Sequence, residues 1–219
     1  MNKNSTQSYF DKECNDFNAS YTDATKLKDF IRRLSFRYNK KAIIGRMTSL
    51  LSLVGNPAQK KILEVGTGPG FYAIEIAKNG GEVTGLDFSS GMLENARDNA
   101  QKESVNIDFI EGDILTTPID KKFDTTFATG VIEYIPKANQ LDFVKKLTEL
   151  STDTIIISFP KKFVLHALIR TIWLTFFKKI KVNYFTKSDI ARLAEAASIV
   201  EVERENIKIL WMIKFKKSS

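Results

Sequence analysis

Residues 61–72, KILEVGTGPGFY, join a short apolar run to a loop with three glycines and then to a stretch of periodic apolar residues. Glycine is favoured where the backbone takes a positive φ or approaches a ligand without a Cβ in the way. A glycine-rich turn between a strand and a helix therefore indicates a cofactor site. Nucleoside triphosphates, dinucleotides and adenosyl cofactors all bind to turns of this kind.

The sequence on both sides of this loop predicts an α/β fold. From Lys61 onward, short β-rich runs alternate with helical ones, which is typical of a mostly parallel sheet. Only Asn206 separates the last two predicted strands, so they form a hairpin and the final strand runs antiparallel. We expect seven strands with helices on both faces of the sheet. The predicted strands are 61–65, 82–87, 106–110, 123–128, 154–159, 200–205 and 207–215.

The predicted domain organisation is a helical cap followed by one α/β domain. Apolar residues recur at intervals of three and four before Gly55-Asn56-Pro57 breaks the pattern. We expect a cap over 1–56 and a main domain over 57–219, with a basic and aromatic insertion at 160–186. In the main domain, the spacing Thr186-Lys187-Ser188-Asp189 predicts a capping box at the start of a helix.

Composition narrows the class of protein. With 43% hydrophobic and 27% charged residues, the chain resembles an ordinary globular protein. Its N-terminus lacks a basic region followed by an apolar one, so no secretory signal is expected. The single cysteine, Cys14, excludes an internal disulfide and supplies no cysteine cluster for a metal. We therefore expect a cytoplasmic protein without a metal site.

The residues after the glycine loop argue against two common ligands. A P-loop requires Lys-Ser or Lys-Thr directly after its last glycine, but Phe71 and Tyr72 follow Gly70. The dinucleotide fingerprint requires a third glycine at position 71, where the chain has phenylalanine. This counts against NAD without excluding it.

Acidic residues near the loop indicate more specifically which ligand binds there. Glu64, Asp87 and Asp113 fall at or just beyond the ends of the first three predicted strands, where open α/β sheets bind ligands. Asp87 follows the loop at about the 20-residue spacing of a carboxylate that accepts hydrogen bonds from ribose hydroxyls. Three carboxylates would repel a pyrophosphate, so the site favours a nucleoside that carries positive charge. S-adenosylmethionine fits, because it has a ribose diol, an adenine amine, an ammonium and a sulfonium.

Four stretches, in order, resemble motifs of the class I S-adenosylmethionine-dependent methyltransferases. They are ILEVGTGPG, VTGLDFSSGML, FIEGDI and FDTTFATGVIEYIP, and the resemblance extends from about Lys60 to Phe215. It implies a Rossmann-like fold, S-adenosylmethionine as cofactor and methyl transfer. The N-terminal YFDKECNDFNASY is also similar to the start of magnesium-protoporphyrin O-methyltransferases and, more loosely, to quinone-pathway methyltransferases. This shorter likeness implies a small, partly hydrophobic acceptor, with the N-terminal helices closing over the cofactor.

The resemblance also implies roles for individual residues. Glu64 and the glycine backbone would hold the methionine part, while Asp87 would bind the ribose. Phe88 and Met92 would flank the adenine, and Asp113 would accept a hydrogen bond from its amine. The complete set of expected cofactor-binding residues is Glu64, Gly66, Thr67, Gly68, Gly70, Asp87, Phe88, Met92, Asp113, Ile114, Thr129 and Gly130, of which Thr129 and Gly130 would line the floor under the sulfonium.

The catalytic group is left open. A general base is needed only if the acceptor must lose a proton. In the family's fourth motif a histidine is common where this chain has Tyr134. The candidates are His166, which is the only histidine, then Tyr134 and Glu133. We expect methyl transfer to an oxygen or nitrogen of a small molecule; the alternatives are non-methyl chemistry of the sulfonium or cofactor binding for regulation.

A strongly basic segment follows the fifth predicted strand. From Lys161 to Lys187 there are seven Lys or Arg residues and no Asp or Glu. Its apolar stretches are too short to span a bilayer. Three interpretations remain: a lid over the acceptor pocket, a peripheral membrane contact through 161–181 in a lipid or quinone methyltransferase, or a homodimer or core helix. Binding to nucleic acid is disfavoured, because the aromatic residues are expected to be packed.

Overall fold

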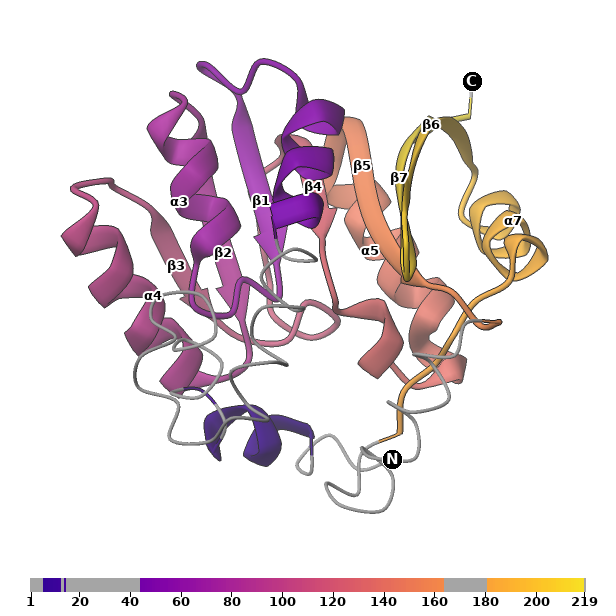
Figure 1. The fold of residues 1–219 in the computed structure, drawn as a ribbon, viewed down its shortest axis with the longest axis horizontal. Coiled ribbons are helices and arrows are strands. Elements are labelled where there is room, and N and C mark those ends of the chain that lie inside the picture. The colour runs from indigo at the N-terminus through magenta and orange to yellow at the C-terminus, as the bar shows by residue number, and fades with distance from the viewer. Residues whose placement is uncertain (1–5, 13, 15–43, 164–180, 219) are drawn as a thin grey trace.

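A computed structural model of the chain describes residues 6–12, 14, 44–163 and 181–218. Within this part, one seven-stranded sheet has the order β3-β2-β1-β4-β5-β7-β6 (Figure 1). Strands β1 to β5 run parallel, and β7 is antiparallel to both of its neighbours. The Rossmann-like arrangement predicted from the sequence is therefore confirmed. The strands are β1 (Lys61–Val65), β2 (Glu82–Asp87), β3 (Asp108–Glu111), β4 (Phe123–Ala128), β5 (Ser151–Pro160), β6 (Ile199–Ile207) and β7 (Leu210–Lys217).

The C-terminal hairpin exists, but its predicted turn was misplaced. Strand β6 continues to Ile207, which pairs with Leu210 at the start of β7. Lys208 and Ile209 form the two-residue connection, a common length for a tight hairpin. The prediction that the last strand begins at 207 was therefore wrong, although its antiparallel direction is confirmed. Strand β3 also starts two residues later than predicted, at Asp108.

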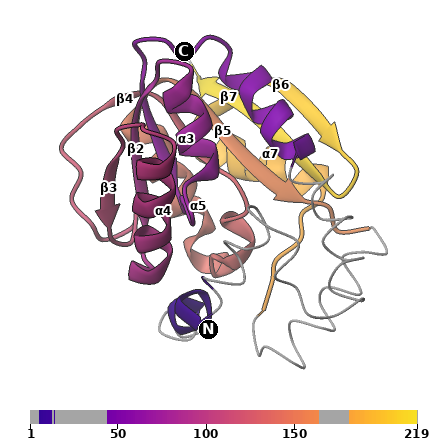
Figure 2. The same ribbon diagram turned by 60° about the vertical axis from the view of Figure 1, so that its left-hand side comes forward.

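Two apolar cores cover the two faces of the sheet. Neighbouring residues of one strand enter different cores, as Ile62 and Leu63 of β1 do, because side chains alternate along a strand. One core includes residues of α5 and α7, while the other includes residues of α3 and of the helix at 44–54. Figure 2 shows α3, α5 and α7 in a view turned by 60° from that of Figure 1. The helices are α3 (Phe71–Lys78), α4 (Ser90–Lys102), α5 (Gln140–Leu150) and α7 (Lys187–Ala196), with 3-10 turns at η2 (Ile132–Tyr134) and η3 (Lys137–Asn139).

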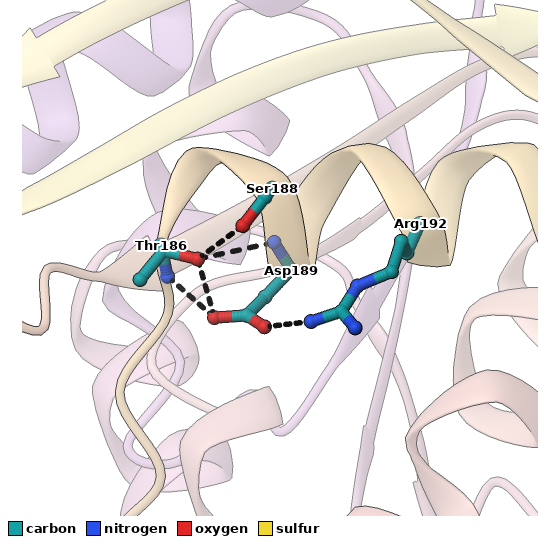
Figure 3. A network of polar contacts seen from close by, with 4 residues as sticks. All are labelled: Thr186, Ser188, Asp189 and Arg192. Atoms are coloured by element: carbon teal, nitrogen blue, oxygen red, sulfur yellow. Dashed lines mark hydrogen bonds and ion pairs between the residues drawn. The ribbon is translucent and has the colours of Figure 1, made fainter.

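Helix α7 begins with the predicted capping box. The Thr186 hydroxyl accepts a hydrogen bond from the backbone N–H of Asp189, and the Asp189 carboxylate accepts one from the Thr186 backbone N–H (Figure 3). Arg192 adds an ion pair to the same carboxylate at 2.5 Å. These contacts fix the point where the chain re-enters the main domain after the basic segment.

Both ends of the basic insertion are anchored to the domain. Lys161 forms a parallel bridge with Phe185, and its ammonium donates to the carbonyl of Ile207 at 2.7 Å. Residues 164–180, with His166, lie outside the described residues, so all three interpretations of the insertion stay predictions. The predicted cap before residue 44 also lies outside the described residues, apart from residues 6–12 and 14, and it too stays a prediction. No helix in the described ranges combines the length and apolarity that crossing a membrane requires.

Candidate functional site

A cavity of about 330 Å³ lies at the carboxyl ends of the parallel strands. This is the edge where open α/β sheets bind ligands. Its walls come from the glycine loop, the ends of β1 and β2, the turns after β3 and β4, the helix at 44–54 and the helical residues 6–12. Ten of the twelve predicted cofactor-binding residues line it: Gly66, Thr67, Gly68, Asp87, Phe88, Met92, Asp113, Ile114, Thr129 and Gly130.

The glycine loop brings backbone to the cavity wall. Gly66 has φ of 72°, and a Cβ there would lie 2.3 Å from Cγ2 of Val131. Gly68 has φ of 52°, but a Cβ there would meet no atom within 4 Å. The first glycine therefore permits close packing of the loop on the turn after β4, whereas the second borders open space.

Glu64 lies behind this loop, outside the cavity lining. It is buried, and its carboxyl group accepts a hydrogen bond of 2.8 Å from the Thr67 hydroxyl. Burial raises the pKa of Glu64 to about 8, while hydrogen bonds from Thr67 and the Ala73 backbone oppose the rise. Its predicted contact with the cofactor stays a prediction, as does that of Gly70, which also lies outside the lining.

Asp87 lies at the end of β2 with its carboxylate at the cavity. It accepts hydrogen bonds from the backbone N–H groups of Gly68 at 2.8 Å and Ser89 at 3.0 Å. Burial raises the pKa of Asp87 to about 6, and these backbone bonds limit the rise. The same two bonds join the glycine loop to the turn after β2, so Asp87 fixes the relative position of two cavity walls.

The turn after β4 carries two of the three predicted catalytic residues. Glu133 and Tyr134 belong to η2, and both line the cavity. Asn183 holds this turn, because its backbone N–H donates to the Glu133 carbonyl at 2.8 Å and its side-chain amide donates to the Ile135 carbonyl at 2.8 Å. On the same turn, the Gly130 N–H donates to Ser158 Oγ at 2.8 Å. The structure thus brings Glu133 and Tyr134 to the predicted cofactor residues.

Arg46 is a cavity residue that the sequence analysis missed. It lies on the helix at 44–54, and its Nε is buried without a hydrogen-bond partner among the described residues. A signal was present in the sequence, because Arg46 shares a helix face with Leu50 and Leu53, both fully buried. A charged residue on the buried face of a helix is unusual and indicates a specific partner.

Thr6 and Phe10 also line the cavity. The N-terminal likeness implied that helices there close over the cofactor, but it did not single out these two residues, because their position depends on contacts with residues about eighty positions away. In the described part of the chain, no cluster of three or more His, Cys, Asp or Glu side chains could hold a metal ion.

The central part of the chain is similar to a known protein family. Residues 62–152 match the family described as a methyltransferase domain. This part of the chain is similar to a methyltransferase domain. The match covers β1 through the start of β5, and so contains the glycine loop, Asp87, Asp113 and η2.

Solved structures of methyltransferases share the fold of this chain. Magnesium protoporphyrin IX methyltransferase from Synechocystis PCC 6803, with bound S-adenosylhomocysteine, aligns with a TM-score of 0.80 at 18% identity over 99% of this chain and 100% of that one. The same enzyme has been solved with S-adenosylmethionine. These alignments confirm the Rossmann-like methyltransferase fold that the four motifs imply.

Curated relatives match over a shorter stretch. A ubiquinone biosynthesis O-methyltransferase from Coxiella burnetii is 30% identical over 83 residues, which are 37% of this chain and 36% of that protein. A release factor glutamine methyltransferase from Flavobacterium psychrophilum is 34% identical over 116 residues, at 42% and 41% coverage. The chain thus spans well under half the length of these relatives.

Proposed function

We propose that this protein transfers the methyl group of S-adenosylmethionine to an oxygen or nitrogen of a small, partly hydrophobic molecule. One observation carries the proposal: a single cavity joins the loop and carboxylate suited to the cofactor, Gly68 and Asp87, to Glu133 and Tyr134. The cofactor and the acceptor can therefore meet without a change in the described fold.

The cavity residues fit the chemical groups of the cofactor. The Asp87 carboxylate would accept hydrogen bonds from the ribose hydroxyls, and the space beside Gly68 would admit the amino-acid tail. The guanidinium of Arg46 supplies the positive charge that the tail's carboxylate requires. Phe88, Met92 and Ile114 present apolar surface to the adenine.

The remaining cavity residues would orient the acceptor. When bound, the cofactor supplies an electrophilic methyl on a sulfonium that leaves as a neutral thioether. Holding two reactants in line can lower the barrier by about 7–11 kcal/mol. Tyr134 and Glu133 line the cavity and would hydrogen-bond the acceptor O–H or N–H and hold its proton. Leu115, Ile135 and Pro136 are apolar lining that would exclude water.

The cavity lining and the relatives support the proposed class of acceptor. Apolar residues line the cavity beside Glu133 and Tyr134, which suits a molecule with a reactive heteroatom on a hydrophobic body. Relatives act in ubiquinone biosynthesis or on magnesium protoporphyrin IX, as their names state. We propose that the protein is cytoplasmic. If the acceptor is a lipid or a quinone, the protein would contact the membrane peripherally through 161–181.

Calorimetric titration with S-adenosylmethionine tests the cofactor site. The wild-type protein should bind, and Asp87→Ala should abolish binding. Asp108→Ala removes an exposed carboxylate from the neighbouring strand and should leave the affinity unchanged. Unchanged affinity in Asp87→Ala would contradict the site assignment.

A second measurement tests the reaction. Incubation with methyl-labelled cofactor and cell extract should place label in a small-molecule product. Consumption of the cofactor without labelled product would rule out methylation and favour non-methyl chemistry of the sulfonium.

A further inference from the structure

One face of the N-terminal helical turn is directed at the cofactor wall. Gln7, Phe10 and Asp11 are spaced so that they lie together on one side of residues 6–12. The Gln7 side-chain amide donates to the backbone carbonyl of Phe88 at 2.7 Å. The Ser89 hydroxyl donates to the Asp11 carboxylate at 2.5 Å. Two consecutive residues of the turn after β2 are thus held from the N-terminal segment.

That turn determines where Asp87 and the adenine wall lie. Ser89 is fully buried, its N–H donates to the Asp87 carboxylate, and its hydroxyl caps α4 by accepting from the Met92 N–H at 3.2 Å. Asp11 therefore contacts the residue that orients the proposed ribose carboxylate. A hydrogen-bonded chain runs from Asp11 through Ser89 to Asp87.

Phe10 connects this wall to the acceptor side of the cavity. Its ring lies edge-on to Phe88, with centroids 6.0 Å apart, and edge-on to Tyr134, with centroids 5.2 Å apart. Edge-to-face contacts of aromatic rings are favourable and directional. A shift of the helical turn would therefore move the adenine wall and the Tyr134 ring together.

We propose that Gln7 and Asp11 are positioning residues for the adenosine half of the cofactor, with Phe10 as the wall between the cofactor and acceptor parts of the cavity. Gln7 and Asp11 act through Phe88 and Ser89. The inference rests on the proposed function, because it assigns the adenosine to the wall formed by Asp87 and Phe88. The two equilibria are linked: docking of the helical turn on this wall increases the affinity for the cofactor, and bound cofactor favours the docked turn by the same factor.

The experiment measures the affinity of the full chain for S-adenosylhomocysteine. Gln7→Ala and Asp11→Ala should each weaken binding, by about tenfold for a lost hydrogen bond near 1.4 kcal/mol. Asp11→Asn keeps an acceptor oxygen for the Ser89 hydroxyl and should restore most of the affinity, whereas Asp11→Leu fills similar space without an acceptor and should bind as weakly as Asp11→Ala. Lys12→Ala removes an exposed residue of the same turn and should bind as the wild type does.

The outcomes separate this inference from the proposed function. If the wild type binds and the variant with both Gln7→Ala and Asp11→Ala binds equally well, the positioning role is overturned while the proposed function stands. Equal losses in Asp11→Asn and Asp11→Ala overturn it as well. If the wild type fails to bind S-adenosylhomocysteine, the proposed function fails and the inference fails with it.

Discussion

The Thr67 hydroxyl donates a hydrogen bond of 2.8 Å to Glu64, and this bond ties the glycine loop to the strand before it. Because Glu64 is buried, its pKa is raised to about 8 and its protonated form predominates at neutral pH. Glu64 therefore stabilises the glycine loop through this hydrogen bond.

Glu64 should make the folded state less stable as the pH rises. The folded protein holds the proton more tightly than the unfolded chain, whose carboxyl group has the model value of 4.5. This contribution to stability is complete below pH 4.5 and is lost as the pH rises through about 8, by at most about 1.4 kcal/mol per pH unit. Urea unfolding of wild type and Glu64→Gln between pH 6 and 9 measures it. The variant should show a flatter dependence; parallel curves would contradict the assignment.

Gly66→Ala and Gly68→Ala should have different consequences. A Cβ at Gly66 clashes with Val131 at 2.3 Å and occurs at positive φ, so the free energy of unfolding should fall by about 2–4 kcal/mol. A Cβ at Gly68 meets no protein atom, so only the left-handed backbone costs stability, by about 1–2 kcal/mol. Gly68→Ala should instead weaken binding of S-adenosylmethionine, because its methyl enters the cavity. Thermal unfolding and calorimetry on both variants distinguish the two effects.

The fold could be predicted because its signals are local. Strand runs, the loop glycines and the capping box at Thr186 each lie within a few residues of one another. The hairpin turn was misplaced because Lys208 and Ile209 contain no glycine, proline, asparagine or aspartate to interrupt the β-rich run. The only such residue nearby, Asn206, lies inside β6 and was taken for the turn.

The site was predictable only in part, because much of it depends on distant contacts. Asp87 follows from motif spacing, whereas Phe10 reaches the cavity through contacts made with Phe88 and Tyr134. Strand alternation also indicates where the Glu64 side chain lies. Glu64 lies two residues after Ile62 on β1, so both side chains lie on the same face of the sheet. Ile62 packs in the core under α3, and the Glu64 side chain is therefore directed beneath that helix.

Arg46 should recognise the carboxylate of the cofactor's amino-acid tail. Arg46→Ala should weaken binding of S-adenosylhomocysteine by at least about tenfold, because a charge-assisted hydrogen bond contributes about 1.5–3 kcal/mol. Adenosine, which lacks the tail, should bind both proteins equally. Competition calorimetry with both ligands tests this, and Lys102→Ala serves as a control for lost positive charge on an exposed helix position. A parallel loss of adenosine affinity would place Arg46 elsewhere.

Asn183 should matter for the geometry of η2 more than for cofactor binding. Asn183→Ala removes the amide that donates to the carbonyls of Glu133 and Ile135, and should lower the free energy of unfolding by about 1–3 kcal/mol. Asn183→Asp should be worse, because a carboxylate would face the same two carbonyl oxygens. Urea unfolding measures both variants, with the exposed Lys181→Ala as control. Equal stability of Asn183→Asp and wild type would contradict the hydrogen-bond assignment.

Cofactor affinity should fall in mild acid because of Asp87. Its pKa is raised to about 6, mainly by burial, and only the ionised carboxylate accepts hydrogen bonds from both ribose hydroxyls. Binding of S-adenosylhomocysteine should therefore be independent of pH well above 6 and weaken by up to about tenfold per unit below it. Calorimetry from pH 5 to 8 measures this profile. Asp87→Asn cannot ionise, so its weaker binding should not change across the range. A wild-type profile that stays flat down to pH 5 would show that Asp87 does not bind the ribose as a carboxylate.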